Sequence, residues 1–226
     1  MARREGRVYT RVVKNLRVKP TADQQASWPA DGRHILAQYD PEAVVVYQAY
    51  RPEIGRYAAE HGRFGAGFRL TRMSWIKPGF LWMMHRCEWA TAPDQESVLA
   101  LWLKRSAFDA ILAQAVKSTF DPEIHATEDE WRRALERSEV RAQWDPDWDA
   151  RGIKLKRRVI QLGLSGETLR QFAQEWIVEI QDISHLAREQ ARYRRHVDML
   201  LTPPEKIYPM SDPEVARRLG IGMKDA

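Results

Sequence analysis

The segment 72–90, RMSWIKPGFLWMMHRCEWA, gathers aromatic, thioether and cationic side chains in one place. It holds three Trp, three Met, one Phe, one Lys and two Arg in nineteen positions. Aromatic faces attract flat rings and cations, while Lys and Arg bind anions. The same residue types also fill hydrophobic cores, so the segment either lines a ligand site or packs inside the protein.

Alternation along a strand would divide the start of this segment between two faces. One face would carry an arginine and a hydroxyl, suited to phosphate or ribose, and the other a tryptophan and a lysine, suited to a ring beside an anion. Alternation alone does not choose between these faces. The helix expected next would pack residues 80–84 in the core and let Arg86 reach back toward the site. The two strand faces are Arg72, Ser74 and Ile76, and Met73, Trp75 and Lys77.

The sequence DPDWDARG, residues 145–152, places three Asp within five positions. It lacks the closing Glu of a calcium loop, so an Asx-turn with solvated carboxylates is favoured over a metal site. The six His form no i, i+4 ligand pair, and Cys87 alone cannot make a disulfide framework within one chain. No phosphate loop, GxGxxG, HExxH or GxSxG motif occurs, so kinase, Rossmann and standard hydrolase functions lose their main support.

Hydrophobic periodicity predicts a mixture of strands and helices around these residues. Because the mixture lacks regular βαβ spacing, it favours an α+β fold over a doubly wound sheet. The last helix would carry Arg188, Arg192 and Arg195 along one side. Strands are expected at 43–50, 67–76, 97–105, the start of 140–152, 156–164 and 176–184, and helices at 52–61, 78–90, 106–118, from 127 onward, 165–174 and 185–200.

Positive charge is concentrated at the N-terminus. Residues 1–19 contain seven Lys or Arg and one Glu, a net charge of +6, which leaves −1 for the rest of a chain whose total is +5. Such an arm either binds phosphate backbones or is simply solvated. We expect a flexible basic extension over 1–32, one domain over 33–220 and a short tail over 221–226. No apolar run approaches the ~18 residues of a membrane span, and a cytoplasmic location is expected.

Several segments resemble one family closely. They are AQYD and VVYQAY within 37–50, RMSWIKPGFLWMMHRCEWAT at 72–91, QWDPDWDARG, RVIQLGLSGE and EWIVEIQDIS. The chain resembles domain-of-unknown-function family 4291 over roughly residues 33–220. His85 stands where the family commonly has Tyr, and Cys87-Glu88 where it commonly has Ser-Gly.

The resemblance implies a relation to the ADP-ribosyltransferase-like fold, a curved, split, mixed or antiparallel sheet flanked by helices that holds NAD. It therefore implies an NAD-consuming ADP-ribosyltransferase, with a nucleic-acid base such as guanine as acceptor. A non-catalytic nucleic-acid-binding module and a transferase with a protein acceptor are the alternatives. The sequence does not fix the oligomeric state.

The implied chemistry assigns roles to particular side chains. Breaking the bond between nicotinamide and ribose needs negative charge near an oxocarbenium-like centre. The catalytic candidates on late strands are Asp145, Gln161 and Glu179, although Glu179 could face water and Gln161 can only hydrogen-bond a ribose hydroxyl. The cofactor-binding candidates are Gln38, Tyr47, Gln48, Tyr50, Arg72, Ser74, Trp75, Lys77 and Arg86, with Tyr47 and Gln48 on opposite faces of their strand.

Overall fold

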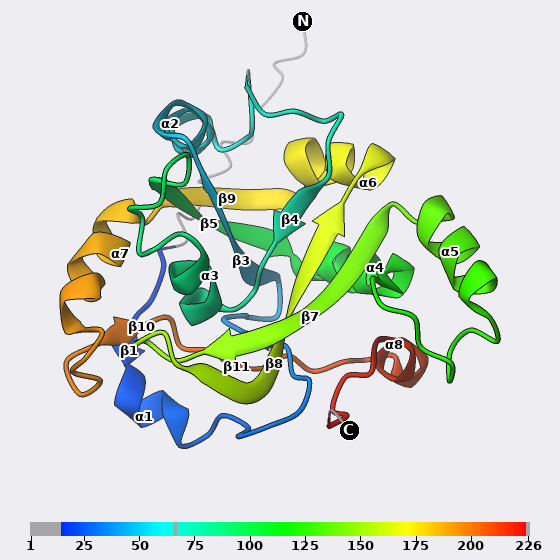
Figure 1. The fold of residues 1–226 in the computed structure, drawn as a ribbon. Coiled ribbons are helices and arrows are strands. Elements are labelled where there is room, and N and C mark those ends of the chain that lie inside the picture. The colour runs from blue at the N-terminus through cyan, green and yellow to red at the C-terminus, as the bar shows by residue number, and fades with distance from the viewer. Residues whose placement is uncertain (1–14, 66, 225–226) are drawn as a thin grey trace, which may run out of the picture.

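The computed structural model describes residues 15–65 and 67–224, whose longer strands form two sheets (Figure 1). The first has the order β3-β5-β9 and is antiparallel. The second has the order β4-β8-β7-β6 and is mixed, because β6 runs parallel to β7. These strands are β3 (Ala43–Tyr50), β5 (Ser97–Lys104), β9 (Ile177–Asp182), β4 (Ser74–Ile76), β8 (Lys154–Leu164), β7 (Val140–Trp148) and β6 (Val116–Lys117).

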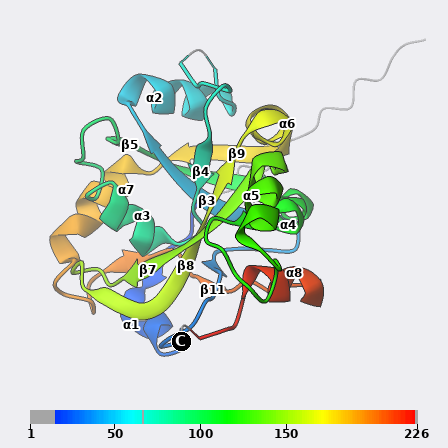
Figure 2. The same ribbon diagram turned by 45° about the vertical axis from the view of Figure 1, so that its right-hand side comes forward.

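Eight α-helices of the described chain surround these sheets, which confirms the predicted α+β class. Figures 1 and 2 show β7 and β8 as a long bent ribbon, with α5 and α8 near one end and α3 and α7 near the other. No helix among the described residues is long and apolar enough to cross a membrane. The helices are α1 (Thr21–Gln25), α2 (Pro52–His61), α3 (Phe80–Arg86), α4 (Arg105–Gln114), α5 (Glu128–Arg137), α6 (Gly166–Gln171), α7 (Ser184–Gln190) and α8 (Pro213–Leu219).

Local end signals place several helices where the sequence predicts them. Pro52 opens α2, and Gly62 ends it with a left-handed φ of 64°. The Thr127 side chain accepts a hydrogen bond from the Glu130 N–H at 3.1 Å, which caps α5 as expected. These contacts are local in sequence, so a local pattern suffices to predict them.

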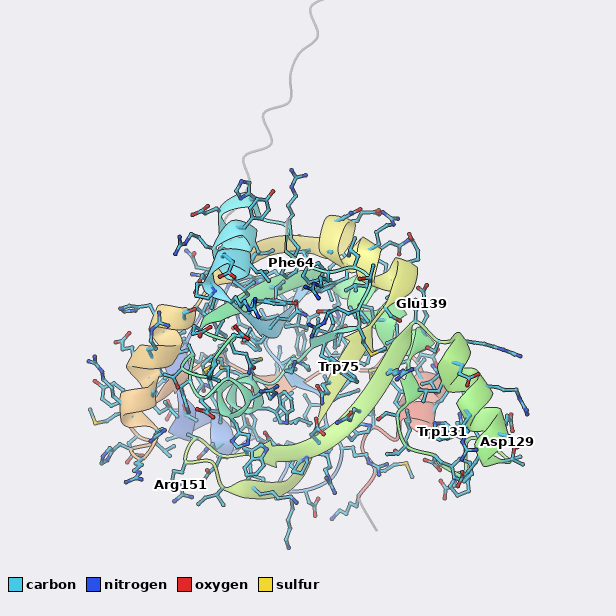
Figure 3. All side chains as sticks on the ribbon, turned by 45° about the horizontal axis from the view of Figure 1, so that its top comes forward. Phe64, Trp75, Asp129, Trp131, Glu139 and Arg151 are labelled. Atoms are coloured by element: carbon cyan, nitrogen blue, oxygen red, sulfur yellow. The ribbon has the colours of Figure 1, made fainter. Side chains whose placement is uncertain are left out.

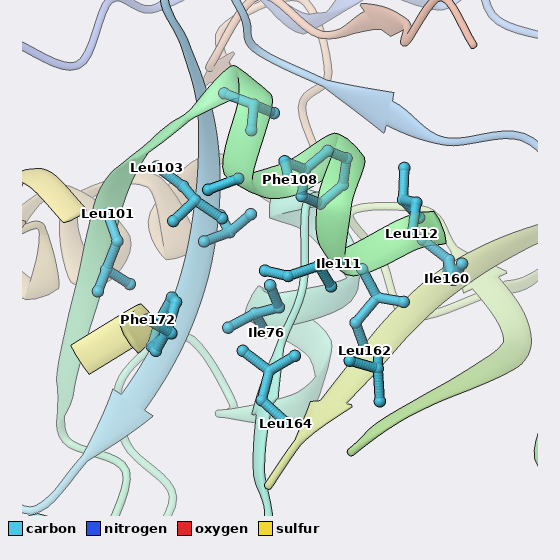
Figure 4. Close-up of a cluster of buried hydrophobic side chains, with 14 of the residues drawn as sticks. Ile76, Leu101, Leu103, Phe108, Ile111, Leu112, Ile160, Leu162, Leu164 and Phe172 are labelled. Atoms are coloured by element: carbon cyan, nitrogen blue, oxygen red, sulfur yellow. The ribbon is translucent and has the colours of Figure 1, made fainter. Parts of the chain in front are cut away.

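The central strand of the first sheet, β5, is buried on both faces, which explains why its residues 98–103 are all apolar. Leu99, Leu101 and Leu103 pack with α4 and the second sheet in the larger core cluster (Figure 4). The alternate residues Val98 and Trp102 pack in a second cluster with α3 and α7. A strand that is covered on both sides can therefore position side chains on either.

A single backbone bridge joins the two sheets directly. The Tyr47 N–H donates to the Lys77 carbonyl at 2.7 Å, and the Lys77 N–H donates to the Tyr47 carbonyl at 3.2 Å. Lys77 directly follows β4, so this bridge fixes the end of β4 against the middle of β3. The most unusual sequence segment thus begins at the junction of the two sheets.

Two predicted elements are shorter than expected. The strand predicted at 67–76 is confined to β4, since Gly67 has a left-handed φ of 96° and the chain turns again at residues 70–72, just before β4. The helix predicted at 185–200 ends as α7 at Gln190, followed by a 3₁₀ turn over Ala191–Tyr193. The Gln190 side chain accepts from the Leu201 N–H at 2.8 Å, which brings the returning chain close. The three arginines predicted on one helix side therefore do not share a helix.

The described part of the predicted N-terminal extension is packed onto the body. β1 (Lys19–Pro20) pairs with β10 (Leu201–Thr202), and the hydroxyl of Thr21 donates to the Leu200 carbonyl at 3.0 Å. Thr21 and Gln24 are buried because they satisfy polar groups of the returning chain. The flexible extension predicted over 1–32 is thus corrected for residues 15–32, and residues 1–14 lie outside the described residues.

The predicted C-terminal tail is also packed in part. The Gly222 N–H donates to the Arg33 carbonyl at 2.7 Å, and the Arg33 N–H donates to the Met223 carbonyl at 2.9 Å. The body therefore extends past residue 220 to 224, whereas residues 225–226 lie outside the described residues. A second short ribbon nearby pairs β2 (Leu36–Ala37) with β11 (Lys206–Ile207).

Candidate active site

The second sheet has one apolar and one polar face. Residues directly paired across strands point to the same side, and the set formed by Ile76, Leu162 and Ala142 lies in the core. The side chains of alternate positions therefore point away from the core. Figure 3 marks the ends of the β7–β8 ribbon by Glu139 and Arg151, with Trp75 between them. We call the following set the polar face: Trp75, Lys77, Arg141, Gln143, Asp145 and Gln161.

The carboxylate of Asp145 is held from both sides on this face. The Gln143 amide donates to its Oδ1 at 2.8 Å, and the Gln161 amide donates to its Oδ2 at 2.6 Å. Gln143 and Gln161 are themselves a cross-strand pair of β7 and β8. Two amides from a rigid sheet thus fix the orientation of one partly exposed carboxylate, as a catalytic group requires.

Lys77 is buried at the edge of the polar face. Its Nζ donates to the Trp75 carbonyl at 3.2 Å and lies 5.5 Å from the centre of the Trp82 ring. Burial, reinforced by the positive charge of Arg86, lowers the pKa of Lys77 to about 8, against the smaller opposing effect of Asp145. The ammonium is therefore poorly solvated and needs an anion more than a surface lysine does.

A second polar network lies on the other side of β4. The Gln48 amide donates to the Ser74 hydroxyl at 2.9 Å and to the Trp75 carbonyl at 3.1 Å, and the Tyr50 hydroxyl lies 3.0 Å from that of Ser74. The Trp75 carbonyl accepts from both Gln48 and Lys77, so it joins this network to the polar face. Burial raises the pKa of Tyr50, which keeps its phenol protonated.

Two buried polar atoms, one beside Trp75 and one on the polar face, lack partners in the described chain. Within the described chain, Gln48 Oε1 and Arg141 Nε are buried without a hydrogen-bond partner. Buried polar groups are normally satisfied, so an open acceptor on Gln48 and an open donor on Arg141 each indicate room for a polar partner. Arg141 was not a sequence candidate, although its i, i+2, i+4 alternation with Gln143 and Asp145 could have revealed all three on one face.

The structure brings most of the predicted site residues together, but not all of them. Arg72 and Arg86 are exposed, and their positive charges act on Tyr50 and Lys77 respectively. Tyr47 instead points into the second core cluster against Phe80, with its ring centre 5.6 Å away. Burial raises the pKa of Tyr47 well above its usual value.

Glu179 and Gln38 lie apart from Asp145. Glu179 belongs to β9 and pairs with Trp102 of β5, so both β5 and β3 separate it from β4. Gln38 precedes β3, where its carbonyl accepts from the Val45 N–H at 2.8 Å. The geometry therefore distinguishes Asp145 from Glu179 as the carboxylate that shares a sheet face with Trp75 and whose charge acts on Lys77.

Asp147 differs from the solvated carboxylate that the Asp-rich motif predicts. It is buried and accepts from Arg157 Nε at 2.9 Å, and burial raises its pKa despite the arginine. Only Asp149 forms the expected Asx-turn, accepting from the N–H groups of Arg151 and Ile153. No group of carboxylate, His or Cys side chains in the described chain could hold a metal ion.

A buried glutamate that the sequence did not indicate lies beneath α3. Glu205 Oε1 accepts from the Phe80 N–H at 2.6 Å, and the Glu205 carbonyl accepts from the Trp28 indole at 2.9 Å. Burial, together with the negative charge of Asp147, raises the pKa of Glu205 to about 8. At neutral pH the side chain is therefore mostly a neutral carboxylic acid within the protein.

Family comparison identifies the kind of domain that carries this arrangement. A model of the domain of unknown function DUF4291 matches residues 34–208, which include every residue of the polar face. The chain belongs to the DUF4291 family. A search of curated proteins found no match. The DUF4291 match spans both sheets, and the buried Glu205 also lies within it.

Lys77→Met is expected to raise the free energy of unfolding at pH 7 by roughly 1–3 kcal/mol, because it removes a buried charge. The Trp75 carbonyl keeps its bond from Gln48. The pKa of Lys77 is lowered in the folded state, so wild-type stability should rise with pH between about 8 and 10.5. The variant should lack this rise. Urea denaturation at pH 7, 8 and 10 measures both effects.

The matched control is Lys104→Met, since Lys104 is an exposed lysine at the end of a strand. It should change stability by no more than about 0.5 kcal/mol. A destabilised Lys77→Met variant would show that Lys77 is satisfied in the fold and needs no ligand.

Proposed function

We propose that this DUF4291 protein is an NAD-dependent ADP-ribosyltransferase that modifies a base of nucleic acid, with Asp145 as its catalytic carboxylate. The observation that carries the proposal is the fixed Asp145 carboxylate between two amides, on the same sheet face as Trp75 and next to Lys77. The same proposal includes a relation between this fold and the ADP-ribosyltransferase-like fold. It is supported by the two sheets that meet at one bridge beside the polar face.

The reaction requires little of the protein beyond binding and electrostatics. The bond between ribose C1′ and the nicotinamide nitrogen breaks, and the electron pair leaves with neutral nicotinamide. A base nitrogen then donates its electron pair to C1′ and loses one proton to solvent or to a carboxylate. Positive charge develops on the ribose between these events, and a preoriented carboxylate stabilises it. Asp145 is suited to this role because its two oxygens are already held in place.

The surrounding side chains match the parts of NAD. Trp75 offers an aromatic surface for a ring, and Lys77, Arg86 and Arg141 offer positive charge for the pyrophosphate. Gln48 Oε1 and Arg141 Nε, without partners in the described chain, would accept from a ribose hydroxyl and donate to a phosphate. The need of the buried Lys77 ammonium for an anion supports the same assignment.

Incubation of the purified protein with NAD and separate pools of single-stranded DNA, duplex DNA, RNA and protein tests the proposal. Free nicotinamide and a mass gain of one ADP-ribose group on a nucleic-acid pool are expected. A mass gain on the protein pool alone would establish the transferase but replace the acceptor. Tight binding of single strands without any nicotinamide release would instead favour a non-catalytic binding module.

A further inference from the structure

A hollow of about 530 Å³ lies on the surface at the C-terminal end of α7. Its lining comes from one short segment, which begins in the 3₁₀ turn that follows α7. Three of the lining residues are arginines, and all three are exposed. We call Arg192, Arg194 and Arg195 the arginine cluster. The lining residues are Ala191, Arg192, Arg194, Arg195 and His196.

The arginine cluster forms no ion pair within residues 15–65 and 67–224. The segment 188–198 holds four Arg against one Glu and one Asp, a net charge of +2. Other exposed arginines differ, since Arg132, Arg170 and Arg217 each pair with a carboxylate on their own helix. Three neighbouring guanidinium groups without carboxylates produce a positive field that attracts a polyanion.

Tight turns hold the arginine cluster in place. The Arg194 N–H donates to the Ala191 carbonyl at 3.4 Å, and the His196 N–H donates to the Tyr193 carbonyl at 2.7 Å. The segment then enters β10, which pairs with β1. Each guanidinium can donate two parallel hydrogen bonds to one phosphate group. Three of them within four residues therefore suit several neighbouring phosphates better than one small anion.

An aromatic pair lies near this segment. Figures 1 and 2 both show the turn between β7 and β8 beside the orange segment that follows α7, and Ala150 in this turn belongs to the same core cluster as Leu200. Trp148 ends β7 just before the turn, and its ring stacks on His85 of α3 with ring centres 3.9 Å apart. His85 is exposed and Trp148 is partly exposed. An unpaired base can stack on such an aromatic surface.

The aromatic pair lies on the same side of the second sheet as Asp145. Asp145 pairs with Val159 across β7 and β8, so their side chains point to one face. A Cβ added at Gly79, the residue before α3, would lie 3.9 Å from Val159 Cγ1. The helix that carries His85 therefore packs against the face that carries Asp145. One bound strand can thus contact the aromatic pair and approach this face.

We propose that the arginine cluster and the His85–Trp148 pair together bind a single-stranded nucleic acid, the arginines through its phosphates and the aromatic pair through an unpaired base. Such a ligand carries its charge on the backbone and offers a flat face on every base. A duplex keeps its bases stacked inside and would use the arginines alone. The inference deepens the proposed function by naming how the acceptor is held, and it rests on that function only for what happens to the bound strand.

Binding in the absence of NAD tests the inference separately from catalysis. Fluorescence anisotropy with a labelled single-stranded DNA would compare the full-length wild type with Arg192→Gln/Arg194→Gln/Arg195→Gln over a range of salt concentrations. Losing three phosphate contacts should weaken binding roughly 10- to 100-fold at about 0.1 M salt and reduce the slope of log K against log salt by about 2. His85→Ala should weaken binding about fivefold or more at every salt concentration and leave that slope unchanged.

The matched control is Arg132→Gln/Arg133→Gln/Arg137→Gln, which removes the same charge from the exposed surface of α5. It should bind within about twofold of the wild type, and all variants should unfold at nearly the same temperature. Equal affinity of the wild type and the arginine-cluster variant, or of the wild type and His85→Ala, would overturn the inference. Binding of anionic phospholipid vesicles through the same arginines, without binding of single-stranded DNA, would also overturn it. If the arginine-cluster variant loses DNA binding while no protein releases nicotinamide, the binding surface stands and the transferase fails.

Discussion

Asp145→Asn is expected to slow nicotinamide release about 10²- to 10³-fold, the usual cost of removing one electrostatic group from a transition state. The substitution keeps the size of the side chain but removes its negative charge. The amides of Gln143 and Gln161 would then face a neutral group that can accept from only one of them. Because the side chains that we propose to bind NAD are other ones, we expect kcat to fall while KM for NAD changes little.

Glu179→Gln is the matched control for this prediction. It makes the same carboxylate-to-amide change on β9. This strand is separated from β3 by β5, and it is β3 that meets the second sheet at β4. Its nicotinamide release should stay within about twofold of wild type, since the carboxylate is remote from Trp75. Steady-state rates with NAD and the acceptor pool measure both variants. A loss of activity in Glu179→Gln with normal activity in Asp145→Asn would refute the site.

Glu205→Gln is expected to stabilise the protein at pH 8 and above by up to about 5 kcal/mol, while leaving stability near pH 5 almost unchanged. Burial raises the folded-state pKa of Glu205 to about 8 from an ordinary value of 4.5. The folded state therefore holds a proton that the unfolded chain releases. This contribution is fully present below pH 4.5 and is lost as pH rises through about 8.

The glutamine variant reproduces the neutral form at every pH. Its Oε1 can still accept from the Phe80 N–H, so the start of α3 should keep its position. Thermal unfolding of wild type and variant at pH 5, 6.5 and 8.5 measures the difference, and other titrating groups cancel in the comparison. Glu214→Gln, which removes an exposed carboxylate paired with Arg217 on α8, controls for the loss of a surface charge. Parallel stability profiles for wild type and Glu205→Gln would contradict a neutral Glu205.

Several parts of the fold could be predicted because their signals are local. The apolar run of β3, the proline and glycine at the ends of α2 and the cap of α5 lie within a few residues of what they determine. The division of Ser74, Trp75 and Ile76 between two faces could also be predicted from alternation, whereas Arg72 and Met73 precede the strand. The sequence could not predict which of these faces would carry a carboxylate, because Asp145 shares a face with Trp75 only through the pairing of β7, β8 and β4.

The residues that sequence reasoning misplaced depend on distant contacts. Asp147 stands in a motif typical of a solvated turn, yet Arg157 from the next strand buries it. Glu205 lies in a proline-rich segment without periodicity, and its burial depends on Phe80 and Trp28. Lys19–Pro20 belong to a basic segment that the sequence predicts to be a free arm. Their partner strand β10 is distant in the sequence, so the local pattern does not reveal the pairing. Each of these positions is determined by a partner that no local window contains.

The pairing of the two chain ends has a consequence for synthesis in the cell. Thr21 bonds to Leu200 and Thr202, residues about 180 positions later, and Arg33 bonds to Gly222 and Met223. A ribosome makes the segment around Thr21 first, but about 180 further residues must follow before that segment can meet its partners. The contacts that close the molecule are therefore the last to form, and their late formation exposes the growing chain to proteases and chaperones for most of its synthesis.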